Sequence, residues 1–184
     1  MKKNFLIVSL LTLLFISCQD EEARTVKVKG KYAIDIPGFL TETNQINEDA
    51  SLQYANVPRE LNIIVIDEPV TDVENAITEN NLENYYSNDL DGYVNLLTDG
   101  LDTEVELDST PKIKSLTING LEARRMDFTG KTDDLHIYWK FTFLKGRNTY
   151  YQVITWTLAD KKEENEPVME KMVNSFTETD KSKK

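Results

Sequence analysis

The sequence predicts an α+β fold in which an antiparallel sheet is flanked by helices on more than one side. Two observations indicate this class. Short segments of alternating apolar and polar residues, bounded by turn residues, lie at residues 25–68 and 103–158, whereas helical spacing is confined to residues 70–101 and to the C-terminus. Strands grouped apart from helices are typical of an antiparallel sheet with helices packed on it. The chain shows no internal repeat and no second domain.

Strands dominate the first third of the chain. We expect them at residues 25–29, 31–36, 51–57 and 60–68. Pro37 and Gly38 end the second of these, and the polar residues 41–50 form a loop. Residues 62–66 are apolar at almost every position, which predicts a strand covered on both faces.

Residues 70–101 form the helical region. Thr71 or Asp72 could cap its first piece, and Gly100 lies near its end. The apolar residues at helical spacing in its second piece are Tyr86, Leu90, Tyr93, Val94, Leu97 and Leu101.

Strands resume after this region. We expect them at residues 103–109, 112–118, 121–128, 135–144 and 149–158. Asn119-Gly120 is the strongest hairpin signal in the chain, because both residues tolerate the positive φ of a tight turn. The last two strands form an aromatic hairpin, and their alternation predicts that Trp139 and Trp156 lie in the core.

A final helix follows residue 158. Asp160 is the expected N-cap, with Glu163 at the capping-box position, and Pro167 disfavours a regular helix before it. The apolar stripe of this helix consists of Val168, Met169, Met172, Val173 and Phe176.

The N-terminus has the order of a targeting segment: Lys2 and Lys3, an apolar stretch over residues 5–16, Ser17 and Cys18. Twelve residues make a helix of about 18 Å, which is short of a bilayer core of about 30 Å. The segment resembles the lipobox of Bacteroidota lipoproteins, which implies a signal peptide over residues 1–17 and an acylated Cys18. An ordinary signal peptide followed by a free thiol, or an uncleaved anchor, is the alternative. A lone thiol is unusual in an oxidising compartment, so we expect lipidation.

The predicted location is the bacterial cell envelope, with the outer membrane favoured. Residues 18–29 then form a lipidated, acidic tether. Asp20, Glu21 and Glu22 are either a solvated spacer or an export signal for the cell surface, so the periplasmic side and the surface both stay open.

The charge of the chain predicts its partners. The formal net charge is −11, and removal of Lys2 and Lys3 with the signal peptide makes it about −13. Such a chain is poorly suited to nucleic acid, which requires a basic patch. We therefore expect contact with the membrane through the lipid anchor alone, and a basic protein as the partner.

Three segments resemble a known family. They are GKYAIDIPGFL at residues 30–40, TINGLEARRMDF at residues 117–128, and YYQVITWTLADKKEENEPVMEKMVNSF at residues 150–176. They are similar to the opening strand and turn, the central hairpin, and the closing strand and helix of the Mog1/PsbP-like superfamily. The resemblance covers residues 30–177 and leaves residues 178–184 as a charged tail. It implies an α/β/α sandwich and brings no catalytic motif. The superfamily includes photosystem accessory proteins, a nuclear-transport cofactor and bacterial lipoproteins without assigned activity.

Catalytic and metal chemistry is poorly supported by the sequence. His136 is the only histidine, and no Gly-x-Ser-x-Gly motif accompanies it. An EF-hand loop with Gly92 at its invariant glycine would begin at Ser87 and end at Thr98, and neither of these is a carboxylate. We expect no catalytic residue, no metal ligand and no cofactor, although a weak calcium site elsewhere on so acidic a chain stays an open alternative.

One further set of acids, Glu104, Glu106 and Asp108, occupies alternate positions of an expected strand. We interpret them as a solvated face, because a glycosidase-like pair needs a cleft that the sequence does not show.

The function that these observations favour is a membrane-anchored lipoprotein with a non-catalytic protein-binding or accessory domain. The sequence does not identify its ligand-binding residues. The alternative is a carrier that holds a small apolar ligand or a lipid in a pocket between sheet and helix, and a hydrolase ranks third. A large apolar cavity would favour the carrier.

Overall fold

The computed structural model describes residues 22–180. The strands are β1 (Arg24–Val28), β2 (Tyr32–Ile36), β3 (Thr41–Glu42), β4 (Ala50–Asn56), β5 (Leu61–Pro69), β6 (Glu106–Leu107), β7 (Lys114–Ile118), β8 (Leu121–Thr132), β9 (Leu135–Lys145), β10 (Thr149–Leu158) and β11 (Thr177–Glu178). The helices are α1 (Val70–Glu79), α2 (Leu90–Thr98), α3 (Leu101–Glu104), the 3₁₀ turn η1 (Ala159–Lys161) and α4 (Lys162–Ser175). The predicted signal peptide and Cys18 lie outside the described residues.

Two antiparallel sheets organise the fold. The larger sheet has eight strands in the order β3-β4-β5-β10-β9-β8-β6, with β7 paired to β8, and the smaller has the order β1-β2-β11. The chain therefore has the expected α+β class. Residues 24–28 form a strand of the smaller sheet, although the predicted division of the chain assigns them to the tether.

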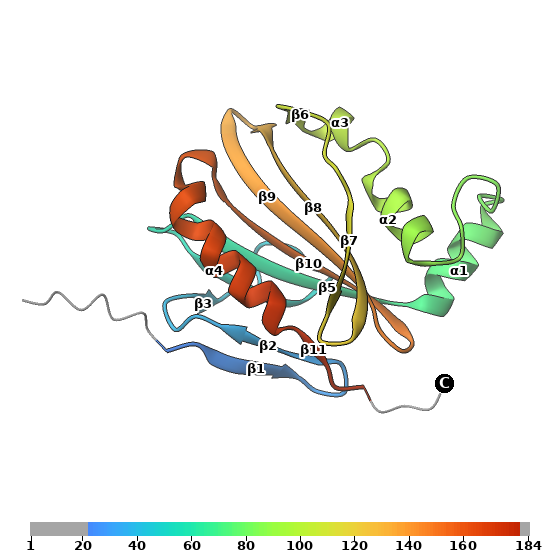
Figure 1. The fold of residues 1–184 in the computed structure, drawn as a ribbon, viewed down its shortest axis with the longest axis horizontal. Helices are drawn as coiled ribbons and strands as arrows, with labels where there is room; N and C mark the ends of the chain where they lie inside the picture. The colour runs from blue at the N-terminus through green and yellow to red at the C-terminus, as the bar shows by residue number, and fades with distance from the viewer. Residues whose placement is uncertain (1–21, 181–184) are drawn as a thin grey trace, which may run out of the picture.

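Helices cover both faces of the larger sheet, as Figure 1 shows: α4 crosses one face, and α1, α2 and α3 lie on the other side. The smaller sheet lies beside α4. The main core lies under α4 and β2. Its fully buried members include Tyr32, Ile34, Ile36, Leu61, Ile63, Tyr138, Tyr151, Met172 and Phe176. This confirms the apolar stripe of the final helix, in which Met169, Met172, Val173 and Phe176 are all buried.

A second, smaller core fixes α1 and α2 to the opposite face. Its buried residues are Val73, Ile77, Leu90, Tyr93, Val94, Phe143 and Tyr150. Tyr93 stacks on Tyr150 with ring centroids 4.4 Å apart. The hydroxyl of Tyr93 donates to Glu68, which also accepts from the amide of Gln152 at 3.0 Å. This core contacts β9 and β10 near their shared turn, through Phe143 and Tyr150. The other end of this sheet face therefore lies outside the second core.

The prediction that Trp139 and Trp156 are core residues is wrong. Both lie on the face away from α4 and are partly exposed. The residues of β9 that are buried on the side of α4 occupy the even-numbered positions, which alternate with Trp139. They include Tyr138 and Leu144, and also Lys140 and Thr142. The face marked by the aromatic alternation is buried only in part: Phe143 lies in the second core, whereas Trp139 stays partly exposed. The face under α4 carries a paired lysine and a threonine, which the alternation does not mark as buried.

Several helix boundaries also differ from those expected. Residues 80–89 are not helical, and α2 begins only after Asp89, whose side chain accepts from the backbone N–H of Gly92. Neither α1 nor α4 has a side-chain cap, and α4 begins at Lys162 with Pro167 inside it. The expected strand over residues 103–109 is reduced to β6, since α3 occupies its start.

The hairpin expected at Asn119-Gly120 is confirmed. Their φ values are 48° and 85°, and the turn joins β7 to β8. The amide of Asn119 also donates to the carbonyls of Asn174 and Phe176, at 2.9 and 2.8 Å. The turn thus fixes the C-terminal end of α4 against the sheet.

Candidate functional site

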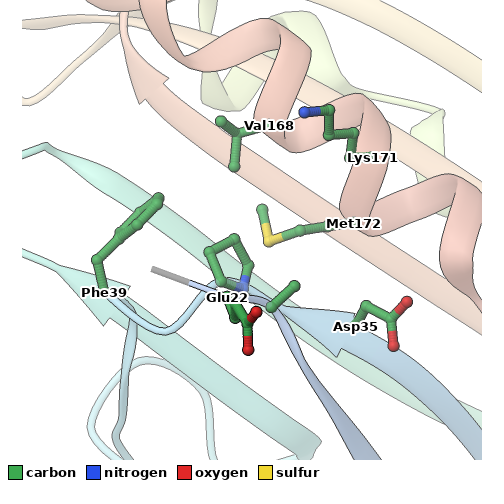
Figure 2. A pocket seen from close by; sticks show the side chains of 8 residues that line it. Glu22, Asp35, Phe39, Val168, Lys171 and Met172 are labelled. Carbon is green, nitrogen blue, oxygen red and sulfur yellow. The ribbon is translucent and has the colours of Figure 1, made fainter. Parts of the chain in front are cut away.

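An apolar cavity of about 330 Å³ lies between β2 and α4, where the described chain begins. Figure 2 shows the side chains around it. Its apolar lining consists of Ala23, Pro37, Phe39, Val168 and Met172, and its polar lining of Glu22, Asp35 and Lys171.

Three separate segments build this cavity. Val168 and Met172 are one helical turn apart, so they share a face of α4. Pro37 and Phe39 lie in the turn after β2, which is closed by a bond of 3.0 Å from the N–H of Leu40 to the carbonyl of Pro37. The guanidinium of Arg59 lies 3.9 Å from the centre of the Phe39 ring and supports it.

The polar groups lie at the rim of the cavity. In Figure 2 the carboxylate of Asp35 and the ammonium group of Lys171 point away from Met172. Asp35 accepts from the hydroxyl of Thr25 at 2.6 Å, so part of its hydrogen-bonding capacity is used outside the cavity. The arrangement suits an uncharged apolar group and presents no acid–base pair to it.

A second feature is the open end of the sheet face opposite α4, which we call the aromatic face. It consists of Asn62, Ile64, Phe128, Ile137, Trp139, Phe141, Ile154, Trp156 and Leu158. Trp139 and Trp156 are paired directly across β9 and β10, and Phe128 stacks on Trp139 with centroids 5.1 Å apart.

The aromatic face is partly solvent-accessible and uncharged. Six of its residues are neither buried nor fully exposed: Asn62, Trp139, Phe141, Ile154, Trp156 and Leu158. None of its nine members carries a charge, although 29% of the chain is Asp, Glu, Lys or Arg. Contiguous apolar surface of this kind is typical of interaction sites in monomeric proteins.

An ionic network connects α4 to the sheet face that it covers. The side chain of Lys140 is only 3% exposed and lies 2.9 Å from Asp127 and 3.1 Å from Glu170. Arg125 donates to both carboxylate oxygens of Glu170, at 2.6 and 2.8 Å. Partial burial opposes ionisation of Glu170. Hydrogen bonds from Arg125, Lys140 and Asn174 outweigh this effect and lower the pKa of Glu170 to about 2. Each buried cation has a carboxylate partner, so the network is a structural anchor.

His136 lies at the end of β9 next to the β8–β9 turn. Its Nε2 is 2.8 Å from Asp108, and both side chains are nearly half exposed. Glu104, Glu106 and Asp108 are all exposed, as expected for a solvated face, but Glu104 belongs to α3. Within residues 22–180, no group of three or more His, Cys, Asp or Glu side chains is placed to hold a metal ion.

A smaller cavity of about 290 Å³ lies between the α2–α3 junction and the segment that leads into β7. Leu101, Ile113 and Met126 contribute apolar surface to it, and Asp99 and Asp102 contribute carboxylates. The hydroxyl of Tyr86 donates to Asp99 at 2.6 Å. None of the helices in the described part of the chain combines the length and the apolar character needed to cross a membrane.

Sequence reasoning missed both the cavity and the aromatic face. The residues that line the cavity come from three segments, and the last of these is more than 120 positions from the other two. No local sequence pattern therefore marks the cavity. The aromatic residues were visible in the sequence but were assigned to the core. No local signal distinguishes the two faces, because Lys140 reads as solvent-facing and its burial depends on Asp127 and Glu170 from other elements.

Comparison with known proteins supports the fold. No protein-family model matches the chain, and no curated protein matches it. Among solved structures, the chain is similar to a cyanobacterial PsbP (CyanoP) from Synechocystis, with 11% identity and a TM-score of 0.53, over 88% of this chain and 95% of that one.

Two further solved structures are similar to this chain. LpqN of Mycobacterium tuberculosis, described as involved in cell envelope biogenesis, has 10% identity and a TM-score of 0.55, over 86% of this chain and 91% of that one. A Bacteroides thetaiotaomicron protein has 9% identity and a TM-score of 0.51, over 83% of this chain and 47% of that one. None of these descriptions states an enzymatic activity. At such identities the likeness shows the fold alone, and it shows that this chain adopts the PsbP-like α+β fold implied by its sequence resemblance.

Proposed function

We propose that this protein is an envelope lipoprotein, anchored by acylated Cys18, whose PsbP-like domain binds a protein partner and carries out no catalysis. The aromatic face is the observation that carries the proposal. Trp and Tyr dominate the energetics of protein interfaces, because their rings bury a large apolar area at a small cost in conformational entropy. Trp139 and Trp156 are adjacent, partly exposed and surrounded by uncharged residues.

The negative charge of the rest of the chain favours a positively charged partner. The net charge of about −13 that remains without Lys2 and Lys3 attracts a basic protein over several ångströms, whereas the neutral aromatic face holds it after contact. We therefore propose a partner with an apolar patch surrounded by basic residues, located on an envelope complex.

The structural neighbours support the location. LpqN is described as involved in cell envelope biogenesis, and it shares the fold over 86% of this chain. Because one fold hosts many functions, this likeness supports the proposal only together with the targeting segment at residues 1–18.

Site-specific photo-crosslinking in intact cells tests the proposal. A photoreactive phenylalanine analogue replaces Trp156 in one variant and Tyr85 in the control, where Tyr85 is 77% exposed and lies outside the aromatic face. We expect one discrete protein adduct from position 156, and none from position 85. Adding Trp139→Ala to the first variant should weaken the adduct at least fivefold. Equal adducts from both positions, or none from position 156, would contradict the proposal.

The apolar cavity favours a second candidate function, the carrier of a small apolar ligand. Its volume of about 330 Å³ lies at the low end of the range of about 300–1,000 Å³ for ligand pockets. Binding of a free alkyl ligand in it should be unaffected or slightly strengthened by salt, since salt does not weaken apolar burial. Titration of the domain over residues 22–180 with a fluorescent long-chain hydrocarbon at two salt concentrations checks this candidate.

A further inference from the structure

We propose that the cavity between β2 and α4 holds one acyl chain of the lipid on Cys18, so that the protein binds part of its own anchor. This inference rests on the lipidation of Cys18 in the proposed function. It goes beyond that function, because it assigns the cavity an occupant and the anchor a second attachment point.

The cavity lies within reach of Cys18. Glu22 is the first described residue, and Glu22 and Ala23 both line the cavity. Cys18 precedes Glu22 by four residues, and a chain of four residues spans at most about 14 Å. An acyl chain linked to Cys18 therefore starts within reach of the cavity, whatever path the intervening residues take.

The lining of the cavity favours an uncharged acyl chain over a free fatty acid. Five of the eight lining residues are apolar, and Met172 among them is only 1% exposed. An acyl chain on a lipoprotein is joined through an uncharged ester or amide. A free fatty acid would instead bring its carboxylate to a rim that already has Glu22 and Asp35 against the single cation Lys171. Repulsion between like charges disfavours the free acid and leaves the uncharged chain as the better occupant.

The size of the cavity limits the occupant to a single acyl chain. A volume of about 330 Å³ accommodates part of one chain rather than a whole multi-chain lipid. The remaining chains of the anchor stay in the bilayer, where their buried methylene groups maintain membrane attachment. One chain in the cavity would hold the domain close to the membrane and limit its rotation, which gives the aromatic face a defined orientation.

Methionine methyl NMR tests the inference on the full-length acylated protein in detergent micelles. Mass spectrometry first establishes that Cys18 carries the lipid. Met172 and Met169 both belong to the main core, but only Met172 lines this cavity, so the methyl group of Met169 serves as the internal reference. We expect nuclear Overhauser contacts from the Met172 methyl group to acyl methylene protons, and none from Met169. The matched Cys18→Ala protein in the same detergent should lack these contacts.

Two variants separate the cavity from the anchor. Ala23→Asp places a charge at an exposed lining position and should abolish the Met172 contacts, while lipidation and the core methyl signals stay unchanged. Lys171→Gln is the control and should retain the contacts. Absence of Met172 contacts in protein confirmed as acylated would overturn the inference and leave the anchor intact. The same contacts in Cys18→Ala protein would show that detergent or free lipid fills the cavity, which also overturns it. Absence of lipid by mass spectrometry would instead overturn the proposed anchoring itself.

Discussion

Lys140 and Arg125 place two positive charges beneath α4, on the buried face of the sheet. Their residues are 2% and 8% exposed, and burial of an unpaired charge would cost several kcal/mol. Asp127 and Glu170 compensate for them, and Glu170 contacts both. The result is a polar connection between β8, β9 and α4 within an otherwise apolar layer.

Glu170→Gln should destabilise the fold in a pH-dependent manner. We expect a loss of about 2 kcal/mol at pH 7, less than for a fully buried pair because the Glu170 side chain is 39% exposed and Lys140 keeps Asp127. The pKa of Glu170 falls from 4.5 to about 2 on folding, so this stabilisation is complete above pH 4.5 and is lost as the pH falls through 2. Urea denaturation at several pH values measures it. The variant should show a shallower decline than the wild type in this window, and Glu163→Gln, at an exposed position of the same helix, should behave as wild type.

Trp139→Ala and Trp156→Ala should each cost only about 1–2 kcal/mol, since both rings are partly exposed. Phe176→Ala should cost about 3–5 kcal/mol, because Phe176 is fully buried and stacks on Tyr32 with centroids 4.9 Å apart. Chemical denaturation of the three variants checks the ranking. Tryptophan costs equal to that of Phe176 would mean that the aromatic face is core.

β9 shows why the sequence predicted the strand but not which of its faces packs under α4. Alternation from Ile137 to Phe143 reads as the core face, whereas Lys140 and Thr142 read as solvent-facing. The pattern records polarity only, and it does not register that Lys140 is neutralised by Asp127 and Glu170 from other elements. Residue-level burial therefore required the tertiary structure.

Among the elements, α2 depends on a close approach that only glycine permits. A Cβ on Gly92 would lie 1.7 Å from the carbonyl oxygen of Ser87, a backbone atom that cannot rotate away. Gly92→Ala should therefore destabilise the protein by more than about 2 kcal/mol, although the same change at an unconstrained helical site stabilises by about 1 kcal/mol. Thermal unfolding checks this prediction. Asn95→Ala, at an exposed position of the same helix, is the control and should be neutral or slightly stabilising.

Elements with strong local signals were predictable, and those shaped by distant contacts were not. The Asn119-Gly120 turn and its strands follow from the φ preferences of the two residues. The start of α2 does not follow from the periodicity of Tyr86 and Leu90, because Asp89 caps the helix between them. Similarly, the strand expected over residues 103–109 is interrupted by α3, and only Glu106–Leu107 pairs with β8.

For the whole molecule, charge and the aromatic face should affect binding kinetics differently. Once the partner adduct at position 156 is identified, its association rate should fall at least tenfold between 0.1 and 1 M salt. The Debye length shortens from about 10 Å to about 3 Å over this range. Dissociation should change less, because it depends on the uncharged aromatic face. Stopped-flow mixing measures both rates, and an association rate independent of salt would rule out electrostatic steering and favour the carrier function.

Attachment of the whole molecule to the membrane through Cys18 is the premise of the proposed function and of the occupied cavity. The most direct measurement is metabolic labelling with radioactive palmitate, followed by separation of membrane and soluble fractions, for the wild type and for Cys18→Ala. We predict a labelled wild-type protein in the membrane fraction, and an unlabelled variant that is released from it. A wild-type protein that takes up no label, together with a variant that stays in the membrane fraction, would contradict the account.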